Sequence, residues 1–207
     1  MSLRQLTFGG GFNQPLERVA WPMSLRQLTF GEGFNQPIER ATFSVSLQRL
    51  TFGQQFDQPI ERAEWPDSLQ ALIFGENFNC PVNNVRWPAS LQELTFGECL
   101  DLPDDRMSMY STFDQYISKS VWPASLRRIT LGGEFRQSLQ GLGTWMPNLE
   151  ALRILEWDID HIPNGSLLVR GIEWPKGLRE LTVFKESILD GVEIPSTVQV
   201  YRPNLLV

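Results

Sequence analysis

A twenty-two-residue period restricts the fold of this chain more than any other feature of its sequence. The pair Ser-Leu recurs at Ser2, Ser24, Ser46, Ser68 and Ser90, and every step between these anchors is twenty-two residues. The stretch MSLRQLTFG at residues 1–9 is repeated letter for letter at residues 23–31. A unit this short cannot bury an apolar core alone, so the units must stack on one another. The sequence therefore predicts a solenoid.

The period becomes less regular in the second half of the chain. The next anchor, Ser125, follows Ser90 by thirty-five residues, which indicates about thirteen extra residues in the fifth unit. We place this insertion at about 107–121, and degenerate units begin at Asn148, Gly177 and Thr197. We interpret residues 1–207 as one solenoid domain with units near 2–23, 24–45, 46–67, 68–89, 90–124, 125–147, 148–176 and 177–196 and a partial unit at 197–207.

One segment of each unit predicts a β-strand. In the second unit, Leu28 and Phe30 alternate with Gln27 and Thr29, which is the period of two typical of strands. The Gly and Pro residues that follow supply turn chemistry, since Gly permits positive φ and Pro cannot donate to a sheet. No segment of the unit has a helical period, so the return path is expected to be extended or a short 3-10 turn. The expected fold class is a leucine-rich-repeat-like solenoid with one parallel strand per coil and little α-helix.

The motif after each strand resembles a known repeat family. Residues 34–38 read FNQPI, with the variants FNQPL at 12–16 and FDQPI at 56–60. This segment resembles the FNIP repeat family, a leucine-rich-repeat-like group named for its Phe-Asn-x-Pro segment. The resemblance is strong in units one to four and weakens later, where residues 135–138 read FRQS. It implies a scaffold whose partners use the exposed face of the strands.

Several columns of the repeat are interpreted as structural. The Leu and Phe columns are expected to form the core, and the Trp-Pro column to roof each coil. The alternative for the exposed tryptophans is a stacking platform for sugars, and hence a carbohydrate-binding module. The column Asn13, Asn35, Asp57, Asn79 and Asp101 predicts a ladder of side chains that satisfy backbone N–H groups.

The outward face of the strands is the candidate binding surface. It holds a column of threonines beside a column whose charge and size vary from unit to unit, as recognition of a partner requires. The alternative is that the threonines reflect β-propensity alone. The candidate partner-binding residues are Gln5, Thr7, Gln27, Thr29, Arg49, Thr51, Glu93, Thr95, Arg128 and Thr130.

The predicted insertion is a second candidate surface. Insertions in repeat proteins often emerge as loops on the binding face, and Met and aromatic residues are enriched where partners dock. The candidate contacts are Met109, Tyr110, Phe113 and Tyr116. The alternative is that the segment folds back over its own solenoid.

Composition and motifs exclude several classes of function. The formal net charge of −6 argues against nucleic acid as a partner, and no apolar run is long enough for a membrane helix. No phosphate loop, nucleophile motif or Cys/His pair is present, and the single histidine, His161, lies near Asp158 and Asp160 without the frame of a calcium loop. We therefore expect no catalysis, no metal and no cofactor.

Two cysteines, Cys80 and Cys99, are too few for a disulfide framework. They favour a reducing intracellular compartment, the cytoplasm first, with an organelle possible if Met1 is not the native start. The first strand follows no capping segment, so Met1 is expected to be an internal start, or the first coil to be covered by a partner or by another copy of the chain. The preferred hypothesis is a non-catalytic protein–protein interaction scaffold. The alternative is a structural subunit of a larger assembly, docked through its uncapped first coil and its insertion.

Overall fold

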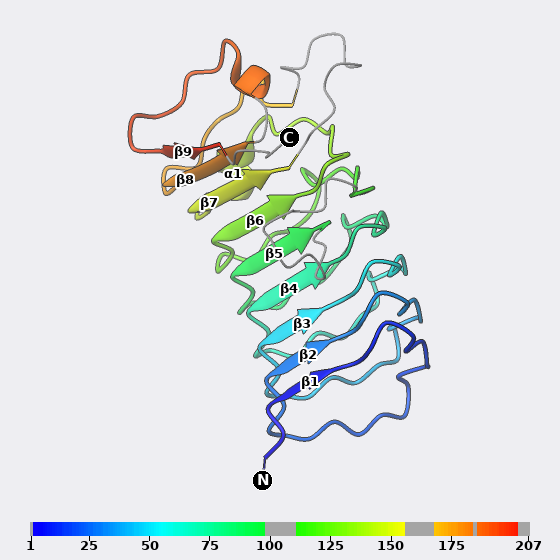
Figure 1. Cartoon of the computed structure of the whole chain (residues 1–207). Helices are drawn as coiled ribbons and strands as arrows, with labels where there is room; N and C mark the ends of the chain where they lie inside the picture. Colours follow the sequence, from blue (N-terminus) through cyan, green and yellow to red (C-terminus); the bar gives the residue numbers. More distant parts are fainter. Residues whose placement is uncertain (1, 98–110, 156–167, 184–185, 203–207) are drawn as a thin grey trace.

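Each repeat unit contributes one short strand, and the strands pair in chain order. The computed structural model describes residues 2–97, 111–155, 168–183 and 186–202. Within these ranges the strands form a nine-stranded parallel sheet in the order β1 to β9, shown in Figure 1. The predicted leucine-rich-repeat-like solenoid is confirmed. The strands are β1 (Gln5–Thr7), β2 (Gln27–Thr29), β3 (Arg49–Thr51), β4 (Ala71–Phe74), β5 (Glu93–Phe96), β6 (Arg128–Leu131), β7 (Ala151–Ile154), β8 (Glu180–Val183) and β9 (Gln199–Tyr201).

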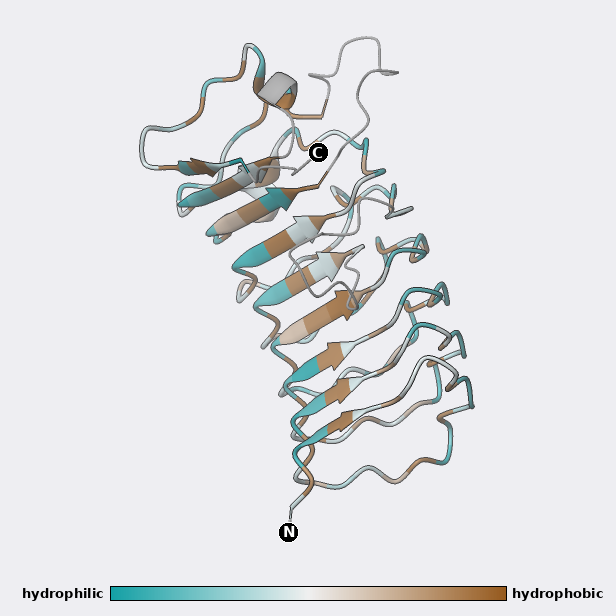
Figure 2. Cartoon of the chain, in the orientation of Figure 1, coloured by the Kyte–Doolittle hydropathy of each residue, from teal (hydrophilic) through white to brown (hydrophobic). Residues whose placement is uncertain are grey.

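The register of the sheet places equivalent residues side by side. From β2 to β3, Leu28 pairs with Leu50 and Thr29 with Thr51, and the same columns continue along the whole sheet. The second residue of each strand points into the core, as does the fourth in the strands of four residues, while the first and third residues point outward. Figure 2 shows the result as apolar bands in the strands, with hydrophilic bands at the beginning of most of them.

Two columns of stacked phenylalanine rings fill the core behind the sheet. Centroids of neighbouring rings lie 5.5–5.7 Å apart in the first column, Phe8, Phe30, Phe52, Phe74 and Phe96. They lie 6.0–6.1 Å apart in the second, Phe12, Phe34, Phe56, Phe78, Phe113 and Phe135. Within a coil the two rings stack at 3.9–4.1 Å. Each ring therefore contacts both neighbouring coils, which is how such short units share one core.

The predicted position of the insertion was wrong. Phe113 is fully buried between Phe78 and Phe135 in the second column. The backbone N–H of Asp114 donates to Asn79 Oδ1 at 3.0 Å, as that of Asn79 donates to Asp57. Residues 111–121 are thus the fifth copy of the motif, read FDQYI at 113–117. The thirteen extra residues are 98–110, outside the described part of the chain.

The predicted polar ladder is confirmed, with Asp114 in the place expected for Asp101. In each of the first five coils, Oδ1 of the Asn or Asp accepts the backbone N–H of the equivalent residue one coil later, at 2.8–3.0 Å. The same oxygen accepts the side-chain amide of the following Gln in most coils. These hydrogen bonds therefore hold the turns of successive coils together, as the stacked phenylalanine rings hold their core segments together.

A second ladder explains the recurring Ser-Leu pair. The Ser68 hydroxyl donates to the carbonyl of Leu47 at 2.7 Å, and Ser24, Ser90 and Ser125 make the same bond to the preceding coil. Serine supplies a short donor where the chain enters the strand. The leucine beside it points into the core, where Leu25, Leu47, Leu69 and Leu91 are fully buried.

The return segments are mostly extended, as expected, with two exceptions. The short helix α1 (Leu142–Trp145) lies in the sixth unit, and the 3-10 helix η1 (Glu186–Leu189) lies in the eighth. Within the described ranges, no helix is long and apolar enough to cross a membrane.

Candidate functional site

The strand face is the surface formed by the first and third residues of each strand. A hollow of about 360 Å³ lies on it between β3 and β8. We call this the charged hollow, because five ionisable side chains line it. Its lining comprises Arg49, Ile73, Glu93, Leu94, Thr95, Arg128, Ile129, Thr130, Ala151, Arg153, Glu180 and Thr182.

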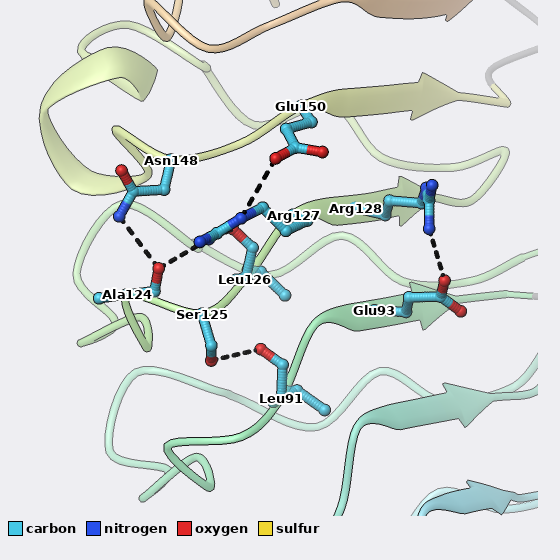
Figure 3. Close-up of polar contacts among 9 residues, drawn as sticks. All are labelled: Leu91, Glu93, Ala124, Ser125, Leu126, Arg127, Arg128, Asn148 and Glu150. Carbon is cyan, nitrogen blue, oxygen red and sulfur yellow. Dashed lines mark hydrogen bonds and ion pairs between the residues drawn. The ribbon is translucent and has the colours of Figure 1, made fainter.

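An ion-paired triad forms one side of the charged hollow. Arg49 Nη1 lies 3.5 Å from Glu93 Oε2, and Arg128 Nη1 lies 2.8 Å from Glu93 Oε1. The Arg128–Glu93 contact is visible in Figure 3. The side chains of Arg49, Arg128 and Glu93 are 43%, 58% and 37% exposed, respectively. At this exposure, each ion pair stabilises the fold by about 1 kcal/mol or less. The triad is therefore easily rearranged.

A small residue makes the longer of these contacts possible. The sheet register places Arg49, Ala71 and Glu93 on three successive strands. Ala71 is buried and has no side chain beyond Cβ, so the Arg49 guanidinium crosses above β4 to reach β5. The pattern repeats in the next three strands as Arg128, Ala151 and Glu180. The short alanine side chains leave the surface recessed, and the longer charged side chains of the neighbouring strands enclose the recess.

The hollow is more basic than the chain that carries it. Its lining holds three arginines and two glutamates, a formal excess of one positive charge, whereas the whole chain has a formal net charge of −6. Arg49 and Arg128 lie in the first-position column, on β3 and β6, and Arg153 on β7 replaces the usual threonine of the third position. The packed side chains beneath the hollow have a low dielectric constant, which strengthens such a local field.

Half of the ten predicted binding residues line this hollow. They are Arg49, Glu93, Thr95, Arg128 and Thr130. Gln5, Thr7, Gln27 and Thr29 lie on the same sheet but in the first two strands, outside the hollow. Thr51 is buried. The prediction omitted Arg153, Glu180 and Thr182, although their positions in the repeat columns could have identified them.

The predicted insertion contacts are not brought together as one surface. Phe113 is buried in the core. Tyr116 is 64% exposed, just before the turn at 118–119, with Lys119 Nζ 5.9 Å from the centre of its ring. Met109 and Tyr110 lie outside the described residues, as do His161, Asp158 and Asp160.

The tryptophan column packs on the core, as its structural interpretation predicted. Trp21, Trp65, Trp87, Trp122, Trp145 and Trp174 are all partly buried against it. Trp87 and Trp122 stack on one another at 5.5 Å, and the Trp122 indole donates to the carbonyl of Ile117 at 3.0 Å. The indole faces of Trp87 and Trp122 that meet in this stack are covered by one another.

Other reactive groups add no further site among the described residues. No cluster of three or more His, Cys, Asp or Glu residues there is arranged to hold a metal ion. Burial, followed by a hydrogen bond to Asp57 and its charge, raises the pKa of the Cys80 thiol to about 12. Cys80 is thus a structural member of the polar ladder, donating to Asp57 Oδ1 at 3.3 Å where other coils have Gln.

Comparison with known proteins confirms the predicted resemblance to FNIP repeats over residues 34–99. The FNIP Repeat model matches residues 34–63 and 56–99. Among curated proteins, none matches the chain significantly. Among solved structures, the chain is similar to CroV588, described as a novel circular LRR protein, with 24% identity and a TM-score of 0.45. That match covers 97% of this chain and 40% of CroV588, so the chain spans less than half of the length of that protein.

Proposed function

From FNIP repeats that build one continuous parallel sheet, we propose that this chain is a non-catalytic protein–protein interaction scaffold and that its strand face binds the partner. The observation that supports it is the charged hollow. In β1 and β2 the first-position column is Gln, whereas in the hollow it varies between Arg, Ala and Glu. Recognition of a particular partner requires residues that differ from unit to unit at exposed positions. Variation in this column leaves the core residues and their packing unchanged.

The proposal is tested by site-directed photocrosslinking in a native extract. A benzoylphenylalanine at Thr182, which lines the hollow, is expected to yield a discrete crosslinked protein. The matched control places the same residue at Asn77, an exposed position in a turn away from the strand face. Equal crosslinking at both positions, or none at Thr182, would count against the strand face as the binding surface.

A second candidate function is supported by the first coil. Leu3 is 46% exposed, whereas its equivalents Leu25 and Leu47 are fully buried by the coil before them. Phe8 and Phe12 are partly buried, while Phe30 and Phe34 are fully buried. An apolar edge of this kind fits a structural subunit that docks another repeat coil or subunit on β1. Under this alternative, Leu3→Glu abolishes assembly in sedimentation velocity, whereas substitutions in the hollow leave assembly unchanged.

A further inference from the structure

We propose that the charged hollow binds a carboxylate presented by an acidic segment of the partner protein, and that Glu93 occupies that carboxylate's place in the unbound chain. The inference rests on the proposed function and specifies the chemistry of its partner. It stands on three observations: the geometry of the triad, the charge of the hollow, and the exposure of the ion pairs.

The geometry of Glu93 is that of a bound anion. Its two carboxylate oxygens are divided between two guanidinium groups, Oε1 to Arg128 and Oε2 to Arg49. These arginines come from β6 and β3, on opposite sides of the strand that carries Glu93. An arginine pair spaced to hold one carboxylate from both sides can hold another, because guanidinium presents several N–H donors in a plane.

The charge of the triad favours an incoming carboxylate. Two arginines share one glutamate, which leaves one unbalanced positive charge on the rim of a hollow in an acidic chain. An acidic peptide is therefore attracted to this place and repelled by most of the remaining surface. The threonine hydroxyls of the neighbouring column, such as Thr95 and Thr182, supply donors for a second oxygen or a backbone carbonyl.

The ion pairs are weak enough to exchange. All three side chains are more than a third exposed, so water and salt already compete with the contacts. A partner carboxylate thus joins the arginines without breaking a buried ion pair. It competes with Glu93 for the same N–H groups, and removing the Glu93 charge must strengthen binding.

The experiment follows the arginine side-chain N–H signals of the labelled full-length chain by NMR. The probe is a capped hexapeptide of alternating Glu and Gly, with a Gln-Gly peptide as its neutral control. The Arg49 and Arg128 signals are expected to shift and saturate with the Glu peptide alone. The Arg127 signal serves as an internal control, because Arg127 is paired with Glu150 at 3.3 Å outside the hollow.

Two matched variants test the competition. Glu93→Gln is expected to tighten peptide binding about two- to fivefold, the range that exposed ion pairs allow. Glu150→Gln makes the same change of charge beside Arg127 and is expected to leave the affinity unchanged (Figure 3). The double variant Arg49→Gln with Arg128→Gln lacks the reporting signals, so its binding is followed through the backbone amides of Thr95 and Thr130, which line the same hollow. These amides are expected to shift with the Glu peptide in the parent and to stay unshifted in the double variant, whose backbone spectrum keeps the dispersion of the folded chain.

Four outcomes overturn the proposal. These are equal shifts at Arg127 and Arg128, unchanged or weaker binding in Glu93→Gln, equal effects of Glu93→Gln and Glu150→Gln, and saturation by inorganic phosphate with no response to the peptide. In each case, crosslinking at Thr182 shows separately whether the strand face still binds a partner of other chemistry. Failure of the carboxylate inference is thereby distinguished from failure of the proposed function.

Discussion

The side-chain oxygen of Asn35 accepts two hydrogen bonds from the next coil. The Asp57 backbone N–H donates at 3.0 Å and Gln58 Nε2 at 2.8 Å. Asn35→Ala is expected to lower the free energy of unfolding by about 1–2 kcal/mol, because both bonds lose their acceptor. Urea denaturation measures the change. Asn77→Ala, at an exposed position in a nearby turn, is the matched control and is expected to change stability by less than about 0.5 kcal/mol.

The neighbouring ladder position predicts the reactivity of a thiol. Since the pKa of Cys80 is raised from 9.0 to about 12, its thiolate is scarce at pH 8 and alkylation by iodoacetamide is expected to be very slow. Asp57→Asn keeps an acceptor for the Asn79 N–H but removes the negative charge beside Cys80. The pKa of the Cys80 thiol is therefore expected to fall and its alkylation rate to rise. Mass spectrometry in a Cys99→Ser background measures the rate at Cys80. An equal rate in the two proteins would show that Asp57 does not control this thiol.

At the scale of the element, the glycine that follows each of the first six strands sets how closely coils approach. A Cβ added to Gly53 would collide with the carbonyl of Gly31 in the preceding coil. Gly53→Ala is therefore expected to destabilise the fold by about 1–3 kcal/mol, measured by thermal or urea unfolding. Gly9 occupies the same column in the first coil, with nothing near its Cβ position. Gly9→Ala is expected to be nearly neutral, and an equal loss in both variants would contradict the packing argument.

The elements were predictable to the extent that the repeat was regular. One strand per unit, its register and its buried face follow from the recurring Ser-Leu pair and the alternation after it. The fifth unit was misread because Tyr116 stands where other units have Pro, which hid the motif. The distance from the motif to the following tryptophan could have identified it, because Phe113 precedes Trp122 by nine residues, as Phe56 precedes Trp65.

The candidate site was less predictable than the fold. Sequence columns identified Arg49, Glu93 and Arg128 as residues of one face. They could not show that Arg49 crosses β4 to Glu93, because that contact depends on the small size of Ala71 and on side-chain conformation. Arg153 stands in a column that is otherwise rich in threonine, and it lines the hollow. At a binding surface, departures from the repeat carry more information than its consensus.

For the whole molecule, the position of the extra segment predicts which deletion the fold tolerates. The Thr112 N–H donates to the Glu76 carbonyl at 2.8 Å, and the Asn77 N–H donates equivalently to Gln54, so Ser111 resumes the repeat directly after Gly97. Deleting residues 98–110 restores the twenty-two-residue step and is expected to preserve the fold, with a melting temperature within a few degrees of the parent. Circular dichroism and thermal melting measure both properties.

The contrasting deletion removes residues 107–121. It takes away Phe113 and Ile117, both buried in the core, and interrupts the aromatic and polar ladders between β5 and β6. This variant is expected to lose cooperative unfolding or to fail to fold. If it melted like the parent while the deletion of 98–110 unfolded, the assignment of the fifth unit would be reversed.

The polar ladder also has a direction. In every described step, the acceptor belongs to the earlier coil and the donor to the later one, from Asn13 and Asn35 through to Asp114 and Arg136. Synthesis on the ribosome proceeds in the same direction. For each newly synthesised coil, the Oδ1 acceptors of the ladder therefore belong to the coil synthesised just before it. The direction of the ladder is thus compatible with its extension by one coil at a time during synthesis.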